Sequence, residues 1–422
     1  MAFVRSDPGG DMSMTVQERA AAAVRSAEPR LLELSHAIHG FAELAFEEHR
    51  SAAVLCEELR GAGFSVETGV AGLPTAFVGT YGTGDFTVGV CLEYDALPGI
   101  GHACGHNIIA TAGLGAVLGL AEVADELGLT VKAIGTPAEE HGGGKVLMLE
   151  AGAFDDLTVS LMIHPGPLDA HPAVSGSQGV CRYSATFTGR AAHAAAAPTQ
   201  GVNAGDAAVV AQVALGLLRQ QLPATARIAS FVREGGEATN IIPARTVVDF
   251  EVREFDIAEL RTLDERVRRC FEAGALATGC ELVIEETEPE YAPLVHDPRL
   301  AEAYARAAEA CGRELAGEKG LSGGSTDMGN VSQHLPALHP IVAVRGTEHP
   351  PHTEGFAADA LSPAADEAVR DGALSMAVAV IAVAADAEQR AALLAEQAER
   401  PGYAARMAER HGGSAQDAAV RA

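Results

Sequence analysis

Four short stretches of the sequence carry side chains that could hold a metal ion or transfer a proton. They are HACGHN, TPAEEHGGGK, LTVSLMIH and EHPPHTEG, and their candidate residues are Cys104, His106, Glu139, Glu140, His164 and His352. Thiolate, imidazole and carboxylate are the ligand types of Zn²⁺ and of its first-row neighbours. If the fold brings the four stretches together, they predict a metal centre.

Taken singly, each stretch has an ordinary explanation. A buried cysteine such as Cys104 usually belongs to the hydrophobic core, an adjacent glutamate pair is usually a solvated turn, and a histidine in a loop is usually only polar. The position of the stretches favours the metal site instead. Three of them follow predicted strands at their carboxyl ends, where open α/β sheets form ligand crevices, and HACGHN begins a helix after the loop CLEYDALPGIG.

The number of candidate ligands also indicates a kind of chemistry. Five ligands are too many for one tetrahedral ion, but they suit two ions that share a bridging group, as in co-catalytic hydrolases. One of the two adjacent glutamates then remains free, since neighbouring residues in an extended segment point in opposite directions. A carboxylate beside a metal-bound water can take its proton and pass it to a leaving nitrogen. The pattern therefore predicts hydrolysis of an amide.

Capping signals and hydrophobic periodicity predict the elements that position these residues. The capping box Thr-Val-Gln-Glu predicts a helix that begins near Thr15. Further predictions are helices at residues 47–62, 107–127 and 145–150, and strands at residues 75–81, 87–94, 130–135 and 157–163. The first two strands flank the turn YGTGD. This alternation predicts an α/β fold with a mixed, mostly parallel sheet flanked by helices.

A different order of elements begins near residue 180. The pattern predicts strands at residues 180–188, 227–233, 245–255 and 281–286, and helices at residues 203–222 and 257–278. Their order along the chain is βαββαβ, which is typical of a ferredoxin-like α+β module. We interpret this module as an insertion into the α/β domain.

The α/β character resumes after Pro293. The sequence predicts a helix at residues 298–311, a strand at residues 340–344 and a helix opened by Ser362-Pro363. The last residues, rich in Ala, Glu and Arg around Gly412-Gly413, predict a surface helix followed by disorder. We therefore predict one catalytic domain from residues 1–179 and 293–390, an inserted domain at residues 180–292 and a C-terminal tail at residues 391–422.

Composition narrows the class of protein. A length of 422 residues suggests two domains, and the formal charge of −27 disfavours nucleic acid and anionic lipid as partners. Seven cysteines form an odd number without framework spacing, so we expect a reducing compartment, the cytoplasm. The first residues contain no apolar segment of signal-peptide length, and the longest apolar stretches, near residues 108–121 and 373–385, are shorter than a membrane span.

Longer motifs, in order along the chain, resemble a known family. They are LEYDALPGIGHACGHN, TPAEEHGGG, MIH, TGRAAHAAAAPTQGVNA, GGEATNIIPARTVVDFEVRE, GSTDMGNVSQHLPALHP and HTEGF, and they run from about residue 30 to about residue 385. They look like the motifs of the metallopeptidase clan of aminoacylases and carboxypeptidase G. The closest branch contains aminobenzoyl-glutamate hydrolase, auxin-conjugate hydrolases and β-alanyl-lysine-type dipeptidases.

The resemblance implies a metal-dependent amidohydrolase that cleaves N-acyl amino acids or small unusual dipeptides. It implies a two-metal catalytic domain and an inserted lid domain. The thiolate among the candidate ligands favours Zn and the nitrogen and oxygen ligands accept Mn, so we expect Zn or Mn as the ions. Cys104 would bridge the ions, Glu139 would be the general base, and the remaining ligands would be His106, Glu140, His164 and His352. Many clan members have a His-x-Asp motif where this chain has Glu93-Tyr94-Asp95. We therefore expect Glu93 not to be a ligand and Asp95 to orient one.

The resemblance also implies roles for residues of the inserted domain. His193 matches a lid residue that reaches the partner subunit's active site and stabilises the oxyanion, so we expect at least a homodimer formed through the lid domain. Asn240 and Arg253 match residues that hold the substrate's carboxylate or carbonyl, and an arginine fork suits a carboxylate. Ser325 and Thr326, in the loop SGGSTD, are expected to line the pocket.

Two other functions compete with this interpretation. The chain could keep the fold as a catalytically silent binding or regulatory protein, although its ligand set is intact. It could also be a thiol hydrolase with Cys104 as nucleophile and His106 as base. Two residues so close in sequence rarely reach that geometry, and no orienting Asn or Asp is evident for this pair.

Overall fold

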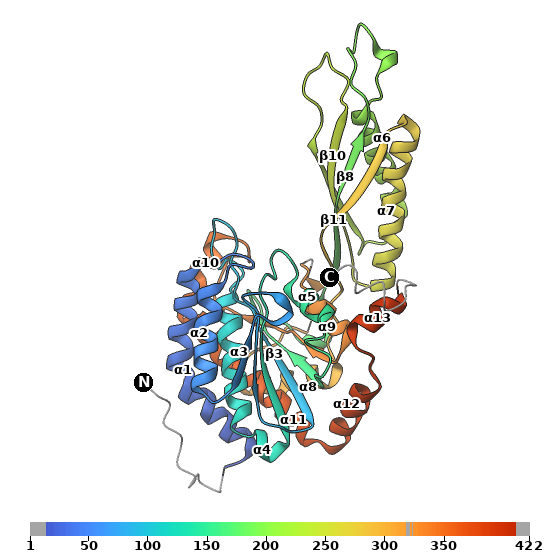
Figure 1. Ribbon diagram of the computed structural model, residues 1–422. Coiled ribbons are helices and arrows are strands. Elements are labelled where there is room, and N and C mark those ends of the chain that lie inside the picture. Colours follow the sequence, from blue (N-terminus) through green and yellow to red (C-terminus); the bar gives the residue numbers. More distant parts are fainter. Residues whose placement is uncertain (1–13, 318–320, 323, 411–422) are drawn as a thin grey trace. The chain divides into compact units, whose positions relative to one another are not determined.

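A computed structural model describes residues 14–317, 321–322 and 324–410, and the chain divides into two compact units (Figure 1). The first unit comprises Met1–Gly176, Val295–Leu321 and Asn330–Ala422. The second unit comprises Ser177–Leu294 and Ser322–Gly329. The metal-ligand candidates all lie in the first unit.

A six-stranded sheet forms the centre of the first unit, in the order β1-β2-β4-β3-β5-β13. The strands are β1 (Ser65–Thr68), β2 (Phe77–Tyr81), β3 (Phe86–Leu92), β4 (Leu129–Gly135), β5 (Val159–Leu161) and β13 (Ala337–Leu338). β3 runs parallel to both β4 and β5, and β13 runs parallel to β5. β2 is antiparallel to β1 and β4. The predicted mixed, mostly parallel sheet is confirmed.

The strand order differs from a simple hairpin at the turn YGTGD. The strands on either side of this turn, β2 and β3, are not neighbours, because β4 lies between them. The turn crosses the start of β4, where Gly84 N–H donates to Leu129 O at 3.2 Å. All seven residues of β3 are buried, as expected for a central strand of a parallel sheet.

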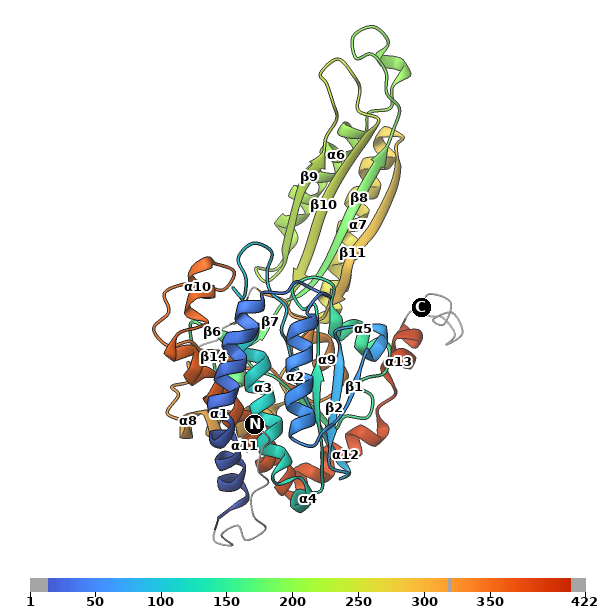
Figure 2. The ribbon, with the colours of Figure 1, turned by 60° about the vertical axis from the view of Figure 1, so that its left-hand side comes forward.

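Three long helices build the core above the sheet: α1 (Val16–Phe41), α3 (His106–Ala121) and α11 (Pro363–Ala385). α3 packs on β3 and β4, and α1 and α11 pack on α3 (Figure 2). α1 begins at the predicted capping box, where the Thr15 hydroxyl accepts from Glu18 N–H and the Glu18 carboxylate accepts from Thr15 N–H. α3 ends earlier than predicted, and a separate short helix, α4 (Ala124–Leu127), follows it.

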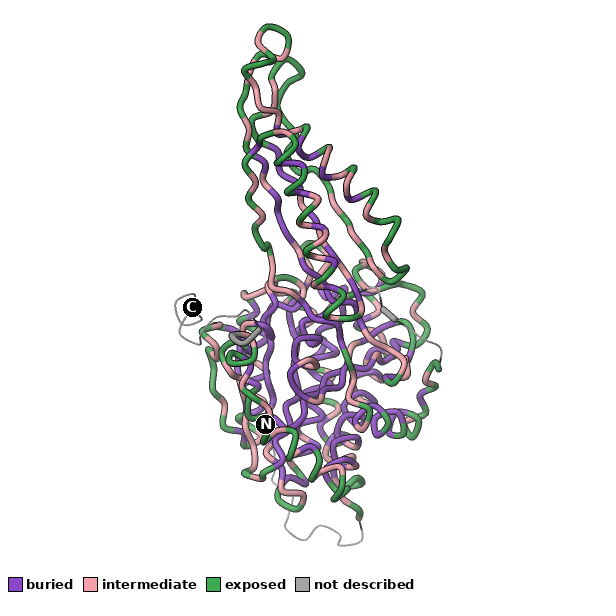
Figure 3. Tube along the Cα trace, turned by 90° about the vertical axis from the view of Figure 1, so that its right-hand side faces the viewer, coloured by how far each residue is buried: buried purple, intermediate pink, exposed green. Residues whose placement is uncertain are grey.

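Among the described residues, α11 alone is long and apolar enough to cross a membrane by length and composition. It exceeds the apolar stretch seen in the sequence, because the helix begins at Pro363, with the Ser362 hydroxyl capping Ala365 N–H. Of its most apolar window, 78% is buried inside the protein, where it contacts α1, α3 and α8 (Pro298–Ala310). α11 is therefore a core helix, and Figure 3 shows that buried residues fill the interior of the unit to which it belongs.

Shorter elements complete the first unit. They are α2 (His49–Gly61), α5 (Gly144–Glu150), β6 (His164–Gly166), β14 (Ile341–Ala343), α10 (Glu354–Asp359), α12 (Ala387–Glu399), α13 (Tyr403–Arg410) and the part of α9 (Met328–His334) from Asn330 onward. The sequence did not predict α9 and α10. The predicted tail contains most of α12 and all of α13, with Leu393 and Tyr403 buried, and residues 411–422 lie outside the described part of the chain.

The second unit has the predicted order βαββαβ. Its elements are β8 (Gly179–Thr188), α6 (Ala204–Leu218), β9 (Arg227–Glu234), β10 (Arg245–Glu254), α7 (Ile257–Thr278) and β11 (Glu281–Tyr291). They form an antiparallel sheet in the order β11-β8-β10-β9, with α6 and α7 packed together. Phe250 stacks on Phe271 of α7 at 4.3 Å between ring centroids, which joins the sheet to the helices.

The close packing of α6 and α7 requires a glycine at position 274. A Cβ atom on Gly274 would lie 2.3 Å from the carbonyl oxygen of Ala207, whereas a Cβ atom on Gly216 would meet nothing within 4 Å. We predict that Gly274→Ala lowers the free energy of unfolding by about 1–3 kcal/mol through overpacking. The exposed control Gly216→Ala should raise it by about 0.5–1 kcal/mol. Urea unfolding of both variants checks this, and effects of the same sign would contradict it.

Candidate metal centre

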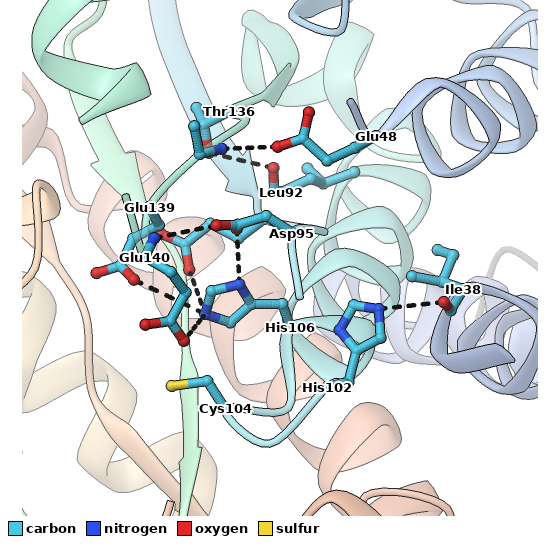
Figure 4. Close-up of polar contacts among 12 residues, drawn as sticks. Ile38, Glu48, Leu92, Asp95, His102, Cys104, His106, Thr136, Glu139 and Glu140 are labelled. Atoms are coloured by element: carbon cyan, nitrogen blue, oxygen red, sulfur yellow. Dashed lines mark hydrogen bonds and ion pairs between the residues drawn. The ribbon is translucent and has the colours of Figure 1, made fainter. Parts of the chain in front are cut away.

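The four stretches with candidate ligands meet in the first unit. Cys104 Sγ lies 3.3 Å from His164 Nε2 and 3.5 Å from His352 Nε2. The two carboxylate oxygens of Glu140 lie 3.5 Å from His352 Nε2 and 3.8 Å from His106 Nε2. Figure 4 shows Cys104, His106 and Glu140 turned toward one another. Residues 248 positions apart in the chain therefore reach a common point.

These separations fit metal coordination. Two ligand atoms bound to one tetrahedral ion at ordinary bond lengths are roughly 3.3–3.8 Å apart. Two groups of ligand atoms lie within 4.8 Å of one another, namely Cys104, His106 and His164, and Cys104, Glu140 and His352. Because both groups contain Cys104, its sulfur is placed to bridge two cations.

Buried atoms at the site lack a hydrogen-bond partner among the described residues. They include Nε2 of His106 and Oε1 of Glu140. A buried polar atom without a partner costs free energy, so native proteins rarely leave such an atom unsatisfied. Divalent cations held by the two ligand groups would satisfy both atoms. The residues present therefore fit the predicted metal pair.

Hydrogen bonds fix the orientation of two of the imidazoles. His106 donates its Nδ1–H to Asp95 at 2.8 Å, and His164 donates its Nδ1–H to Pro165 O at 2.7 Å. Each ring therefore presents its Nε2 to the other candidate ligands. Asp95 also accepts from the backbone N–H of Glu140 at 3.0 Å, so one carboxylate aligns two ligands. Asp95 therefore has the position that its predicted orienting role requires, since it is hydrogen-bonded to two candidate ligands.

Protonation at the site favours ligation over thiol catalysis. Burial, followed by the charge on His106, lowers the pKa of His164 to about 4, so this imidazole is neutral. Burial and then the charge of Glu140 raise the pKa of Cys104 well above its usual value. Without a cation Cys104 is a neutral thiol, which is a poor nucleophile, and a cation that binds the sulfur must displace its proton.

The backbone conformation of Gly105 directs the side chains of Cys104 and His106 to the same site. Gly105 has φ of 75°, and a Cβ atom there would lie 2.6 Å from Pro165 Cγ. Only glycine adopts this conformation without steric cost, and it allows Cys104 and His106 to serve one centre. His352, with φ of 66°, donates its N–H to Ala103 O at 2.8 Å. This hydrogen bond ties the distant histidine to the HACGHN segment.

The two adjacent glutamates do not lie in an extended segment as predicted. They form a turn, and both carboxylates lie within 4 Å of His106 Nε2, at 3.9 Å for Glu139 and 3.8 Å for Glu140. The physical reason is Ala138, whose left-handed φ of 60° turns the chain after β4. Glu139 is 6% exposed and faces the candidate ligands, which suits a general base.

The strand predicted at residues 157–163 also differs from the structure. β5 ends at Leu161, and His164 begins a separate strand, β6, which pairs with β14.

Three residues near the site were not predicted to take part. Glu93 Oε2 lies 3.7 Å from His106 Nε2, so Glu93 is closer to the centre than the sequence suggested and belongs to a third possible ligand group. Its other oxygen pairs with Lys145, and both side chains are 0% exposed. His339 is buried and stacks on His164 at 5.7 Å between ring centroids. The motif LPALHP contains His339, but one histidine beside prolines gives no sign of this contact.

The candidates in the second unit form two separate pairs. His193 lies beside Asn240. His193 forms an isolated antiparallel β-bridge with Ile241, and Ala194 N–H donates to Asn240 O at 2.9 Å. Arg253 donates to the Ser325 hydroxyl at 3.2 Å, and its Nε and Nη2 contact Glu251 at 2.9 and 3.2 Å.

The fork of Arg253 that the sequence offered to a substrate is thus engaged by a carboxylate of the protein. Burial would raise the pKa of Glu251, but hydrogen bonds and charge from Arg253, together with Arg182, lower it, so the pair stays ionised. Thr326 is buried, and its hydroxyl accepts from Met328 N–H at 3.1 Å at the start of α9.

Comparison with known proteins gives consistent matches. Residues 91–370 match the family described as peptidase family M20/M25/M40. The chain is 40% identical over 370 residues to the Xaa-Arg dipeptidase of Mus musculus, covering 83% of this chain and 84% of that protein. It is 30% identical over 278 residues to a component of the p-aminobenzoyl-glutamate hydrolase of Escherichia coli (strain K12), covering 61% of this chain and 57% of that protein.

A solved structure shares the fold. It is a dinuclear metal binding peptidase from the M20 family of Bacillus subtilis, with a TM-score of 0.62 and 21% sequence identity. The alignment covers 84% of this chain and 99% of that structure.

The buried pair of Glu93 and Lys145 should contribute strongly to stability. Lys145→Met would leave the Glu93 carboxylate buried without its cation, which we expect to lower the free energy of unfolding by about 3–5 kcal/mol. Lys132→Met is the matched control, because Lys132 pairs with Asp156, whose side chain is 61% exposed, and should cost at most about 1 kcal/mol. Chemical denaturation measures both, and equal losses would contradict the prediction.

Proposed function

The chain belongs to peptidase family M20/M25/M40 and is a metal-dependent hydrolase of amide bonds, and from this membership we propose that it cleaves small dipeptides or N-acyl amino acids at the candidate metal centre. One observation carries the proposal. Two ligand groups share Cys104, and the carboxylate of Glu139 lies beside them. We propose the first unit as the catalytic domain and the second as its lid.

The proposed cofactors are two divalent cations. Cys104 would be shared, with His106 and His164 on one cation and Glu140 and His352 on the other. When bound, such cations polarise a scissile carbonyl and lower the pKa of water. The thiolate favours Zn²⁺, whereas a shell made mostly of nitrogen and oxygen accepts Mn²⁺, so we propose one of these two metals.

Glu139 would move the protons of the reaction. Its carboxylate takes a proton from the attacking water and donates it to the nitrogen that leaves. The side chain is nearly buried, which strengthens its electrostatic interaction with the reacting atoms. Asp95 would keep His106 and Glu140 in place during these transfers, since it is bonded to both.

The proposed substrate has a free carboxylate and, in the favoured case, a basic C-terminal residue. A carboxylate would compete with Glu251 for Arg253, while Ser325 supports the guanidinium from its other side. Two observations support a basic residue. The relative from Mus musculus is named an Xaa-Arg dipeptidase, and a chain of net charge −27 attracts cationic substrates.

We also propose a cytoplasmic location. The seven cysteines all lie within the described residues as thiols rather than disulfides, which supports this proposal.

Activity with defined substrates and metals tests this function. We expect turnover of dipeptides ending in Arg or Lys, N-acetyl amino acids or p-aminobenzoyl-glutamate, lost on chelation and restored by Zn²⁺ or Mn²⁺. Glu139→Gln should lower kcat by about 10²- to 10⁴-fold while the variant still binds metal.

The same experiment separates the competing functions. Turnover that resists chelation but is lost after iodoacetamide treatment would support a thiol hydrolase. Metal binding without turnover of any substrate would support a silent homologue.

We also propose that the active enzyme is a homodimer in which His193 serves the partner's site. His193 Nδ1 accepts from the backbone N–H groups of Ala195 and Ala196 at 3.3 and 3.1 Å, so Nε2 carries the proton and can donate to an oxyanion. The loops that carry His193 and Asn240 lie beyond the Arg245 end of β10, whereas Arg253 lies at the other end, about 26 Å away along the strand. One protomer therefore does not bring both pairs to one substrate.

An apolar surface of the second unit supports this assembly. Val209, Val213 and Leu217 recur at helical spacing on α6 and are each more than half exposed. β9 is an edge strand of the sheet and exposes Phe231. An exposed apolar helix face beside an open strand edge is typical of a surface that pairs with another chain.

Charge introduced on this surface should separate the protomers. We predict that Val213→Glu gives a monomer and lowers turnover, because the partner's His193 is then lost. Val283→Glu is the control, since Val283 is similarly exposed but lies on β11, the opposite edge strand. Light scattering and kcat measure both effects. A Val213→Glu monomer with full activity would overturn the role of His193 in the partner's site.

A further inference from the structure

Glu48 is a buried carboxylate that the proposed chemistry does not use. It is 0% exposed and precedes α2. Its Oε1 accepts from the backbone N–H of Ala138 at 2.9 Å and from that of Phe46 at 3.0 Å. Its Oε2 accepts from the Thr75 hydroxyl at 2.8 Å. Figure 4 shows Glu48 reaching the segment that follows β4, on the side away from the ligands.

The two backbone groups that Glu48 binds belong to residues in a disfavoured conformation. Phe46 has φ of 64° and Ala138 has φ of 60°. A side chain other than glycine rarely adopts this left-handed region, and such residues persist where the surrounding contacts hold them. A single carboxylate oxygen holds both of them.

Ala138 controls where the next two side chains point. It directly precedes Glu139 and Glu140, and its carbonyl oxygen accepts from Gly143 N–H at 3.0 Å, which closes the turn. Glu48 therefore fixes the amide of Ala138 while Gly143 fixes its carbonyl. Without the Glu48 contact, the turn would relax toward an ordinary φ and move both carboxylates away from His106.

The far side of Glu48 is anchored as well. The Thr75 hydroxyl binds Oε2, and the Thr75 carbonyl accepts from the Tyr94 hydroxyl at 2.6 Å. Tyr94 is 0% exposed and lies between Glu93 and Asp95 in the sequence. The same contacts therefore connect the turn that carries Glu139 with the loop that carries Asp95.

We propose that Glu48 is a positioning residue for the hydrolytic reaction, acting through the peptide of Ala138 to place the carboxylates of Glu139 and Glu140. This inference rests on the proposed roles of those two glutamates. The hydrogen bonds of Glu48 go to Phe46, Thr75 and Ala138 and not to a candidate ligand, so its contribution lies in geometry.

Removal of the Glu48 carboxylate should lower kcat more than it changes KM. We expect Glu48→Ala to reduce kcat by about 10²-fold, because a misplacement of about 1 Å has that effect, with KM within about threefold. The dissociation constant for Zn²⁺ should rise by about 10- to 100-fold, since Glu140 is displaced. Glu48→Gln should keep most activity, because its amide oxygen can accept both N–H groups and its amide nitrogen can donate to Thr75.

Glu43 provides the matched control for loss of a carboxylate. It lies in the same loop and also accepts three hydrogen-bonding groups, namely Arg50 N–H at 2.9 Å, Ser51 N–H at 2.9 Å and the Ser51 hydroxyl at 2.8 Å. These contacts hold the start of α2 and do not involve the turn after β4. Glu43→Ala should therefore lower stability but leave kcat within about threefold.

A second-site change separates positioning from general destabilisation. Glycine accepts a positive φ without steric cost, so Ala138→Gly added to Glu48→Ala should restore kcat by about tenfold. If Glu48→Ala does not fold, Thr75→Val gives a milder test, because it keeps the carboxylate but removes its Oε2 partner. It should lower kcat several-fold, and Ala138→Gly should again restore it.

The outcomes distinguish this inference from the function on which it rests. Full turnover by Glu139→Gln would overturn the proposed function. A Glu139→Gln variant without turnover, together with a Glu48→Ala variant of normal kcat, would overturn only the role of Glu48. Equal losses in Glu48→Ala and Glu43→Ala with no rescue by Ala138→Gly would also overturn it, because the loss would then follow stability alone.

Discussion

The crowding of negative charge around His106 is the constraint on which the site depends. Carboxylates of Glu93, Asp95, Glu139 and Glu140 all lie within 4 Å of this one buried imidazole. In a low-dielectric interior such a cluster is costly unless positive charge accompanies it. Burial would lower the pKa of His106, but the charge and hydrogen bond of Asp95, with Cys104 and Glu93, raise it well above the usual value. Lys145 supplies one cation of the protein's own, and a pair of divalent metal ions would supply the rest.

The fold meets this constraint by bringing several segments to one edge of the sheet. The turn with Glu139 follows β4, and the loop with Asp95 follows its parallel neighbour β3. The carboxyl ends of parallel strands meet at the same edge, so loops after them converge. His102 belongs to the supporting structure, since it is fully buried and bonds Ile38 O at 3.1 Å, and burial lowers its pKa to about 3. His102 thus belongs to the packing around the HACGHN segment that carries Cys104 and His106.

Local chemistry made part of this structure predictable. Capping at Thr15 and the βαββαβ order depend on residues near one another in sequence, and short motifs mark the candidate ligands that the fold brings together. The insertion of β4 between β2 and β3 was not readable, because strand order depends on long-range pairing. The left-handed conformation of Ala138 was equally hidden, since alanine gives no turn signal and the distant Glu48 stabilises it. The pairing of Arg253 with Glu251 was not predicted either, because the motif that points to Arg253 does not show which side chain its guanidinium contacts.

The position of His352 in the chain has a consequence for biosynthesis. Its imidazole lies 3.5 Å from Cys104 Sγ, although 248 residues separate the two in sequence. When Cys104, Glu140 and His164 of a nascent chain have left the ribosome, His352 has not yet been synthesised. The group of Cys104, Glu140 and His352 can therefore assemble only after the 248 residues that separate Cys104 from His352 have been synthesised.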